Sequence, residues 1–105
     1  KHINPSVYVF MQGHSEFGIT GDASLKNWDV KARLKTLTVP TLSIGSKYDT
    51  MDPEHMKWIA NEVQNGRFLF CPNGSHLSQY DDQKTYFKGL ITFLKDVDNG
   101  TFNKK

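Results

Sequence analysis

The chain has 105 residues, of which 37% are hydrophobic and 23% charged, and it carries a formal net charge of +2 at pH 7. This composition is typical of one globular domain at most, and no apolar run approaches the roughly 20 residues that a membrane span needs. The lysines are scattered along the chain rather than gathered in a basic stripe. We therefore expect neither a nucleic-acid partner nor a membrane partner.

The first stretch, from Pro5 to Met11, is rich in aromatic and β-branched residues. Residue propensity alone predicts a strand there, although the run is short and fits the buried end of a helix equally well. The glycines at positions 13, 18 and 21 then indicate a loop. The apolar residues between Leu25 and Leu37 are spaced too irregularly for more than a helical turn or two, around residues 29 to 34.

A strand, an acidic loop and a helix follow in that order. The β-prone run Thr41 to Ile44 ends at Gly45, and the turn-rich segment after it carries Asp49. The helix after this loop is well signalled, because Asp52 can cap it and Pro53 fits its first turn. Asn65-Gly66 provides its stop, and its apolar stripe consists of Met56, Ile59, Ala60 and Val63.

The segment from Arg67 to Cys71 predicts a second strand, nearly all apolar and so covered on both faces. The turn Pro72-Asn73-Gly74-Ser75 places His76 on a loop. Asp81 or Asp82 can cap a last helix, which then frays into a polar tail. The apolar positions of that helix are Tyr86, Phe87, Leu90, Ile91 and Leu94.

This order of elements is a βαβα unit, so the fold class is α/β with a parallel sheet flanked by helices. Parallel strands joined by a helix bring their carboxyl ends to one edge, which places Asp49 and His76 together. An imidazole held by a carboxylate is the general-base half of a nucleophilic triad. The alternative from the pattern alone is that Asp49 caps a turn and His76 is a solvated loop histidine.

Several segments together resemble the C-terminal part of α/β-hydrolases, and most closely the proline iminopeptidase family of serine peptidases. They are Y-V-F-M-Q-G-H-S-E-F-G-I-T-G (8–21), V-P-T-L-S-I-G (39–45), Y-D-T-M-D-P (48–53) and C-P-N-G-S-H-L-S-Q-Y-D-D (71–82). The likeness runs over nearly the whole chain, from residue 4 to about residue 94.

The resemblance implies roles for three residues. Asp49 and His76 correspond to the triad acid and base of the family, and Glu16 corresponds to a residue that anchors the free amino terminus of the substrate. His14 stands where the family usually has proline, a departure that leaves the Glu16 carboxylate in place. The resemblance also implies a peptide substrate with a free N-terminal proline and no metal or organic cofactor.

The third member of a triad, a serine on a G-x-S-x-G elbow, is not found in the sequence. Ser15 comes closest, but its second glycine is one residue late and the residues after it do not predict a helix. Ser75 adjoins His76 and would project away from it, so we expect a role in turn hydrogen bonding. We therefore expect the nucleophile upstream of Lys1, and a chain that is inactive alone and needs the missing N-terminal part or self-association to fold stably.

The resulting organisation has three parts: residues 1–24 as the exit of a cap domain and linker, 25–97 as the C-terminal part of an α/β-hydrolase core, and 98–105 as a polar tail. Two alternatives to a proline-releasing peptidase stay open. One is another α/β-hydrolase acting on an ester, amide or epoxide, and the other is a non-enzymatic binding or assembly domain on the same scaffold.

Metal binding and disulfide bonding are not expected. Cys71 is the only cysteine, which excludes an internal disulfide and a C-x-x-C zinc pair, and the histidines lack ligand spacing. The compartment stays open between cytoplasm and periplasm, because a chain without disulfides fits both.

Overall fold

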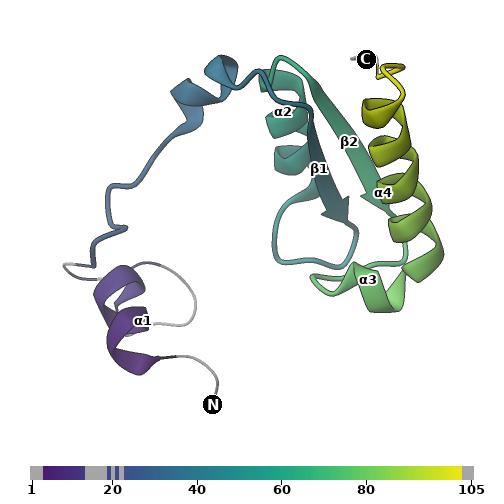
Figure 1. Ribbon diagram of the computed structural model, residues 1–105. Helices are drawn as coiled ribbons and strands as arrows, with labels where there is room; N and C mark the ends of the chain where they lie inside the picture. Colours follow the sequence, from purple (N-terminus) through teal and green to yellow (C-terminus); the bar gives the residue numbers. More distant parts are fainter. Residues whose placement is uncertain (1–3, 14–18, 20, 22, 103–105) are drawn as a thin grey trace. The chain divides into compact units, whose positions relative to one another are not determined.

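The computed structural model describes residues 4–13, 19, 21 and 23–102. Within it the chain forms two compact units, residues 1–31 and 32–105, each of which is considered by itself. The second unit contains both strands and most of the helices (Figure 1).

In the first unit, helix α1 spans Pro5–Gln12. The strand that propensity favours here is not formed, because the local signals at both ends of the run are helical. The Asn4 side chain accepts hydrogen bonds from the amides of Ser6 (3.0 Å) and Val7 (3.2 Å), which is a typical N-cap. Pro5 fits the first turn, and Gly13 ends the helix with a φ of 87°.

The second unit is built on a parallel pair of strands, β1 (Thr41–Ser46) and β2 (Gly66–Cys71), which pair in register from Thr41 with Gly66 to Ser46 with Cys71. A 3₁₀-helix, η1 (Lys31–Thr36), precedes β1 where a broken helical turn is predicted. Both predicted strands are therefore confirmed, and each is slightly longer than predicted.

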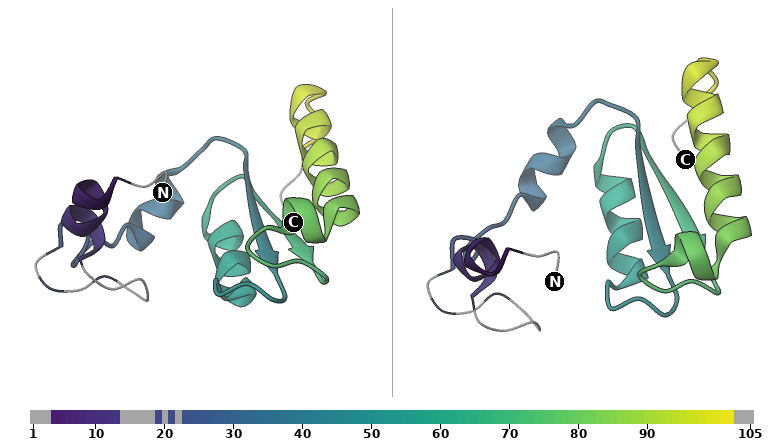
Figure 2. Two further views of the ribbon diagram at one scale, coloured as in Figure 1. Left: turned by 90° about the horizontal axis from the view of Figure 1, so that it is seen from below. Right: turned by 60° about the horizontal axis from the view of Figure 1, so that its bottom comes forward.

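Helices cover both faces of this sheet. Helix α2 (Pro53–Glu62) packs on one face and α4 (Gln83–Asp98) on the other, with the short helix α3 (Ser78–Asp81) just before α4 (Figure 2). The three layers are those of an α/β fold, in which a parallel pair is joined by a crossover helix.

Helix α2 begins as predicted, but it ends at Glu62, before the predicted stop at Asn65-Gly66. The Asp52 carboxylate accepts a hydrogen bond from the Glu54 amide at 3.0 Å, and Pro53 occupies the first turn. Ala60 and Val63 are buried against the sheet, at 2% and 0% exposure. Gly66 permits the tight return into β2, because a Cβ atom there would lie 1.9 Å from the Ala60 carbonyl oxygen.

Helix α4 differs from the prediction at both ends. Neither Asp81 nor Asp82 caps it with a side-chain hydrogen bond, since both carboxylates bond to the loop before α3 instead. At the other end α4 continues to Asp98 and closes at Gly100, whose φ of 68° suits the left-handed position after a helix. The predicted fraying into a tail is therefore wrong up to Asp98.

An ion pair and three aromatic contacts hold the end of α4 on the sheet. Arg67 of β2 binds Asp96 at 2.8 Å, and its guanidinium also lies over the rings of Phe93 and Phe102. Phe102 in turn meets Phe93 edge to face at 5.6 Å between ring centroids. The start of the predicted polar tail is thus part of the packed structure. Among the described residues, no helix is long and apolar enough to cross a membrane.

Candidate active site

Asp49 and His76 meet at the edge of the sheet where both strands end. Asp49 lies three residues after β1, and His76 lies five residues after β2. The His76 Nδ1 atom is 3.1 Å from Asp49 Oδ1 and 3.3 Å from Oδ2, although 27 residues separate the two in the chain. The parallel register of β1 and β2 is what brings them together, because it places Ser46 beside Cys71 at the common end.

The two partners differ in their exposure to solvent. The Asp49 side chain is only 10% exposed, whereas that of His76 is 68% exposed. This is the arrangement that a carboxylate and a base need, since the acid is held in place while the imidazole can reach a reacting group.

Asp49 is held in its ionised form. Burial raises the pKa of its carboxyl group, but the hydrogen bond from the Met51 amide (3.0 Å) and the contact with His76 outweigh that effect. The net result is a pKa below the ordinary value for aspartic acid. An ionised Asp49 accepts the proton on Nδ1 of His76, which leaves Nε2 as the nitrogen available for proton transfer.

The loops that carry Asp49 and His76 are tied together through the backbone. The Tyr48 amide donates to the Gly74 carbonyl oxygen at 2.9 Å, and the Lys47 amide donates to that of Cys71 at 3.2 Å. These bonds continue the pairing of the strands past their ends. The separation of Asp49 and His76 is therefore fixed by main-chain geometry as well as by their own contact.

Beneath the loops lies a buried group of small side chains. Ser46, Cys71 and Ser78 are 2%, 0% and 5% exposed, and a Cβ atom on Gly74 would come within 2.7 Å of the Ser78 Cβ. Burial raises the pKa of the Cys71 thiol above its ordinary value, against hydrogen bonds from Ser78 and Ser46 that lower it. Cys71 thus fits the role of a small buried residue and not of a nucleophile.

Two carboxylates that sequence reasoning assigned to a helix cap belong to this site instead. Asp82 Oδ2 accepts a hydrogen bond from the Asn73 amide at 3.0 Å, and Asp81 Oδ1 accepts one from the Ser75 amide at 3.0 Å. The Ser75 hydroxyl also donates to Asp81 Oδ2. The sequence signal was an Asp-Asp pair soon after a glycine-containing turn, and it is equally typical of a helix N-terminus.

The third predicted site residue, Glu16, lies outside the described residues, as do His14 and Ser15. No group of three or more histidine, cysteine or acidic side chains that could hold a metal ion occurs in the described part of the chain.

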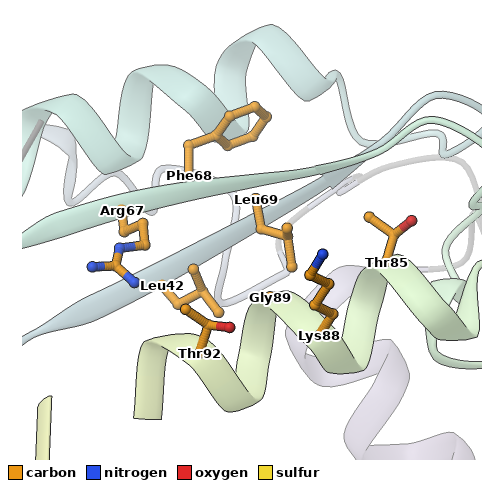
Figure 3. A pocket seen from close by; sticks show the side chains of 8 residues that line it. All are labelled: Leu42, Arg67, Phe68, Leu69, Thr85, Lys88, Gly89 and Thr92. Carbon is orange, nitrogen blue, oxygen red and sulfur yellow. The ribbon is translucent and has the colours of Figure 1, made fainter. Parts of the chain in front are cut away.

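A cavity of about 440 Å³ lies away from Asp49 and His76, between the sheet and α4 (Figure 3). Its walls include Leu42 and Leu69 from the strands and Lys88 and Gly89 from α4. None of its lining residues belongs to the loops of the site. We attribute no chemistry to it, because its walls are mostly apolar and it is open to solvent.

The solved structure of VinJ matches the fold with a TM-score of 0.74 and 27% sequence identity, over 88% of this chain and 30% of that one. Together with the parallel strands, the helices on both faces and the polar residues at the carboxyl edge, this defines the chain as part of an α/β-hydrolase.

Sequence similarity makes the assignment more particular. Proline iminopeptidases from Elizabethkingia meningoseptica and Flavobacterium johnsoniae are 54% and 52% identical to the chain over 98% of its length. Over nearly its whole length the chain is similar to a C-terminal segment of proline iminopeptidases, so the resemblance stated from its motifs is confirmed. It spans only about a third of these relatives, 35% and 34% of their lengths. No family model matches the chain.

Proposed function

We propose that this chain supplies the acid and the base of a serine peptidase that releases N-terminal proline from peptides. The observation that carries the proposal is the hydrogen bond between Asp49 and His76 at the carboxyl edge of the sheet. It occurs in a chain whose relatives of 52% and 54% identity are named proline iminopeptidases.

In this proposal His76 acts through Nε2. It takes the proton of a serine hydroxyl as that oxygen attacks the carbonyl carbon of the scissile bond, and returns the proton to the leaving amine. Asp49 holds the ring in the tautomer with its proton on Nδ1 and stabilises the imidazolium that forms. The lowered pKa of Asp49 supports this role, because the carboxyl group stays charged at neutral pH.

The serines near the site do not suit the role of nucleophile. Ser75 donates its hydroxyl to Asp81, and Ser43 donates its hydroxyl to the Met56 carbonyl oxygen. Ser46 and Ser78 are almost completely buried. We propose that the nucleophile and its oxyanion donors belong to a preceding segment, which the relatives have in the two thirds of their length that the chain does not span.

For Glu16 we propose the role of anchor for the substrate's free amino terminus. The support is the G-H-S-E-F-G segment in the sequence and its likeness to the same family. A carboxylate is the natural partner of a substrate ammonium group, and its charge would favour a free N-terminus over a blocked one.

The test uses a joined protein, in which this chain follows the upstream two thirds of the Elizabethkingia meningoseptica relative. We expect the joined protein to hydrolyse proline arylamides and to be labelled by a fluorophosphonate probe, and the 105-residue chain alone to do neither. A joined protein that folds but cleaves only esters, other amides or epoxides would replace proline release by the corresponding activity. A folded joined protein without any hydrolysis or labelling would favour the non-enzymatic alternative.

Replacing Glu16 by glutamine tests the anchor separately. We expect KM for a proline arylamide to rise at least tenfold, while cleavage of an N-blocked substrate is unchanged or improved, because the lost contact is to the ammonium group. Equal effects on both substrates would remove Glu16 from this role.

A further inference from the structure

Asp81 forms a clamp on the residue that immediately precedes His76. One carboxylate oxygen accepts a hydrogen bond from the Ser75 amide at 3.0 Å, and the other accepts a hydrogen bond from the Ser75 hydroxyl. Asp81 lies at the end of α3, so this bidentate contact joins the helix to the loop that leaves β2. A charged acceptor that receives two hydrogen bonds from one residue fixes that residue's orientation as well as its position.

Ser75 extends the clamp to the other side of His76. Its hydroxyl oxygen accepts a hydrogen bond from the Leu77 amide at 3.1 Å while its proton goes to Asp81. The amide before His76 is thus bonded to Asp81, and the amide after it is bonded to the Ser75 hydroxyl. The φ and ψ angles of His76 have little room to change while these bonds persist.

His76 needs such a constraint, because packing does not provide one. Its side chain is 68% exposed, and its contact with Asp49 depends on the direction in which the backbone presents the ring. After loss of the clamp, the direction of the imidazole would depend on the Tyr48–Gly74 backbone bond and on the contact with Asp49 alone.

We propose that Asp81, acting through Ser75, is a positioning residue that aims the His76 ring at Asp49 and at the reacting group. The catalytic consequence rests on the proposed function, whereas the effect on the Asp49 contact does not. The Ser75 hydroxyl and amide hold the pKa of the Asp81 carboxyl below its ordinary value, so the clamp is charged at neutral pH.

The test compares three variants of the joined protein with a control. Asp81→Asn keeps one acceptor for the Ser75 amide but cannot accept the hydroxyl proton, and Ser75→Ala removes the hydroxyl alone. Ser75→Thr restores a hydroxyl. Asp98→Asn is the control, because it removes an exposed aspartate of α4 that is remote in sequence from the loop.

The first readout is the pKa of Asp49, measured by NMR on protein labelled at the aspartate carboxyl carbons. We expect it to rise in Asp81→Asn and in Ser75→Ala, because Asp49 loses the bond from His76, and to stay low in Ser75→Thr and Asp98→Asn. Loss of the Asp81 charge alone would act in the opposite direction, since removing a negative charge makes a nearby carboxyl group more acidic. A rise in the pKa of Asp49 therefore indicates that the His76 ring has moved, whereas a fall indicates only the loss of the Asp81 charge.

The second readout is the cleavage of a proline arylamide. We expect kcat to fall about 10- to 100-fold in Asp81→Asn and Ser75→Ala with little change in KM, as for a displaced catalytic group. In Ser75→Thr we expect most of the parent kcat to be retained. If Asp81→Asn fails to fold, Ser75→Ala and Ser75→Thr decide the question.

The outcomes distinguish the two proposals. If His76→Ala abolishes activity but Asp81→Asn and Ser75→Ala change neither kcat nor the pKa of Asp49, the clamp is refuted and the proposed function stands. If His76→Ala retains activity, the proposed function fails, and the pKa of Asp49 alone decides whether Asp81 orients the ring.

Discussion

The amide of Tyr48 donates a hydrogen bond to the carbonyl oxygen of Gly74 at 2.9 Å, and this backbone contact joins the loop of Asp49 to the loop of His76. It lies beyond the last paired residues of β1 and β2. The site is therefore an extension of the sheet, and its geometry depends on how closely the two loops approach each other.

Gly74 permits this approach because it has no side chain. In Gly74→Ala the new Cβ would lie 2.7 Å from the Ser78 Cβ and 3.0 Å from the Cys71 Cβ, two buried atoms with little room to move. We expect a loss of about 1–3 kcal/mol in the free energy of unfolding, as for overpacking, together with reduced activity of the joined protein. Urea unfolding and proline arylamide kinetics provide the measurements.

The control for this change is Asn73→Ala, which alters the neighbouring exposed side chain but keeps the Asn73 amide that bonds to Asp82. We expect Asn73→Ala to lower the free energy of unfolding by less than half as much as Gly74→Ala does. Equal stability of Gly74→Ala and the parent protein would show that the two loops can separate freely.

Acid should weaken the fold through Asp49. Its pKa is lower in the folded protein than the unfolded value of about 4, so the stability it contributes is fully present above that pH and is lost as the pH falls through the lower folded value. We expect the unfolding free energy of the parent to fall more steeply below about pH 4 than that of Asp49→Asn.

Asp29 and Asp81 also have lowered pKa values, but both variants contain them, so the difference between the two pH curves isolates Asp49. Urea titrations at pH 7, 5, 4 and 3 would measure it. If the unfolding free energies of the parent and of Asp49→Asn run parallel down to pH 3, the contacts of Asp49 contribute nothing to stability.

The 105-residue chain alone should expose apolar surface. On α4, Phe87, Ile91 and Leu94 are 40%, 48% and 51% exposed at helical spacing, and in the described part of the chain β1 pairs with β2 alone. Such a stripe and a bare strand edge favour association. We expect binding of a hydrophobic dye and a melting temperature that rises with concentration, and loss of both properties in the joined protein.

Replacing Ile91 by lysine provides a matched check, since it places a charge in the stripe. It should reduce dye binding of the chain alone and destabilise the joined protein. A chain that melts cooperatively as a monomer, without binding the dye, would overturn the expectation that it needs a further segment or a second copy.

Much of the second unit could be predicted from local signals. Asp52 and Pro53 mark the start of α2 by a mechanism that does not depend on the rest of the fold, whereas the helix ends at Glu62, before the predicted stop, and Gly66 begins β2. The meeting of Asp49 and His76 followed from the parallel order of the strands. The catalytic roles of both residues stay predictions, as does that of Glu16.

The errors arose where one residue can satisfy two kinds of partner. An aspartate before a helix can bond to the helix or to the loop before it, and only the tertiary position of Ser75 decides that Asp81 bonds to the loop. At α1 the aromatic and β-branched run left strand and helix equally open, and the structure forms the helix, with Asn4 as its cap. Phe102 looked like part of a polar tail because its contact with Phe93 depends on the closure at Gly100.

Whether Asp49 and His76 act as one catalytic pair is tested by a double-mutant cycle on the two residues in the joined protein, with kcat/KM for a proline arylamide as the measurement. If the two residues act as one acid and base pair, each of Asp49→Ala and His76→Ala should lower kcat/KM by roughly 10³- to 10⁴-fold, and the double variant should be hardly worse than either. Substantial activity in His76→Ala, or independent and multiplying losses in the double variant, would contradict the account.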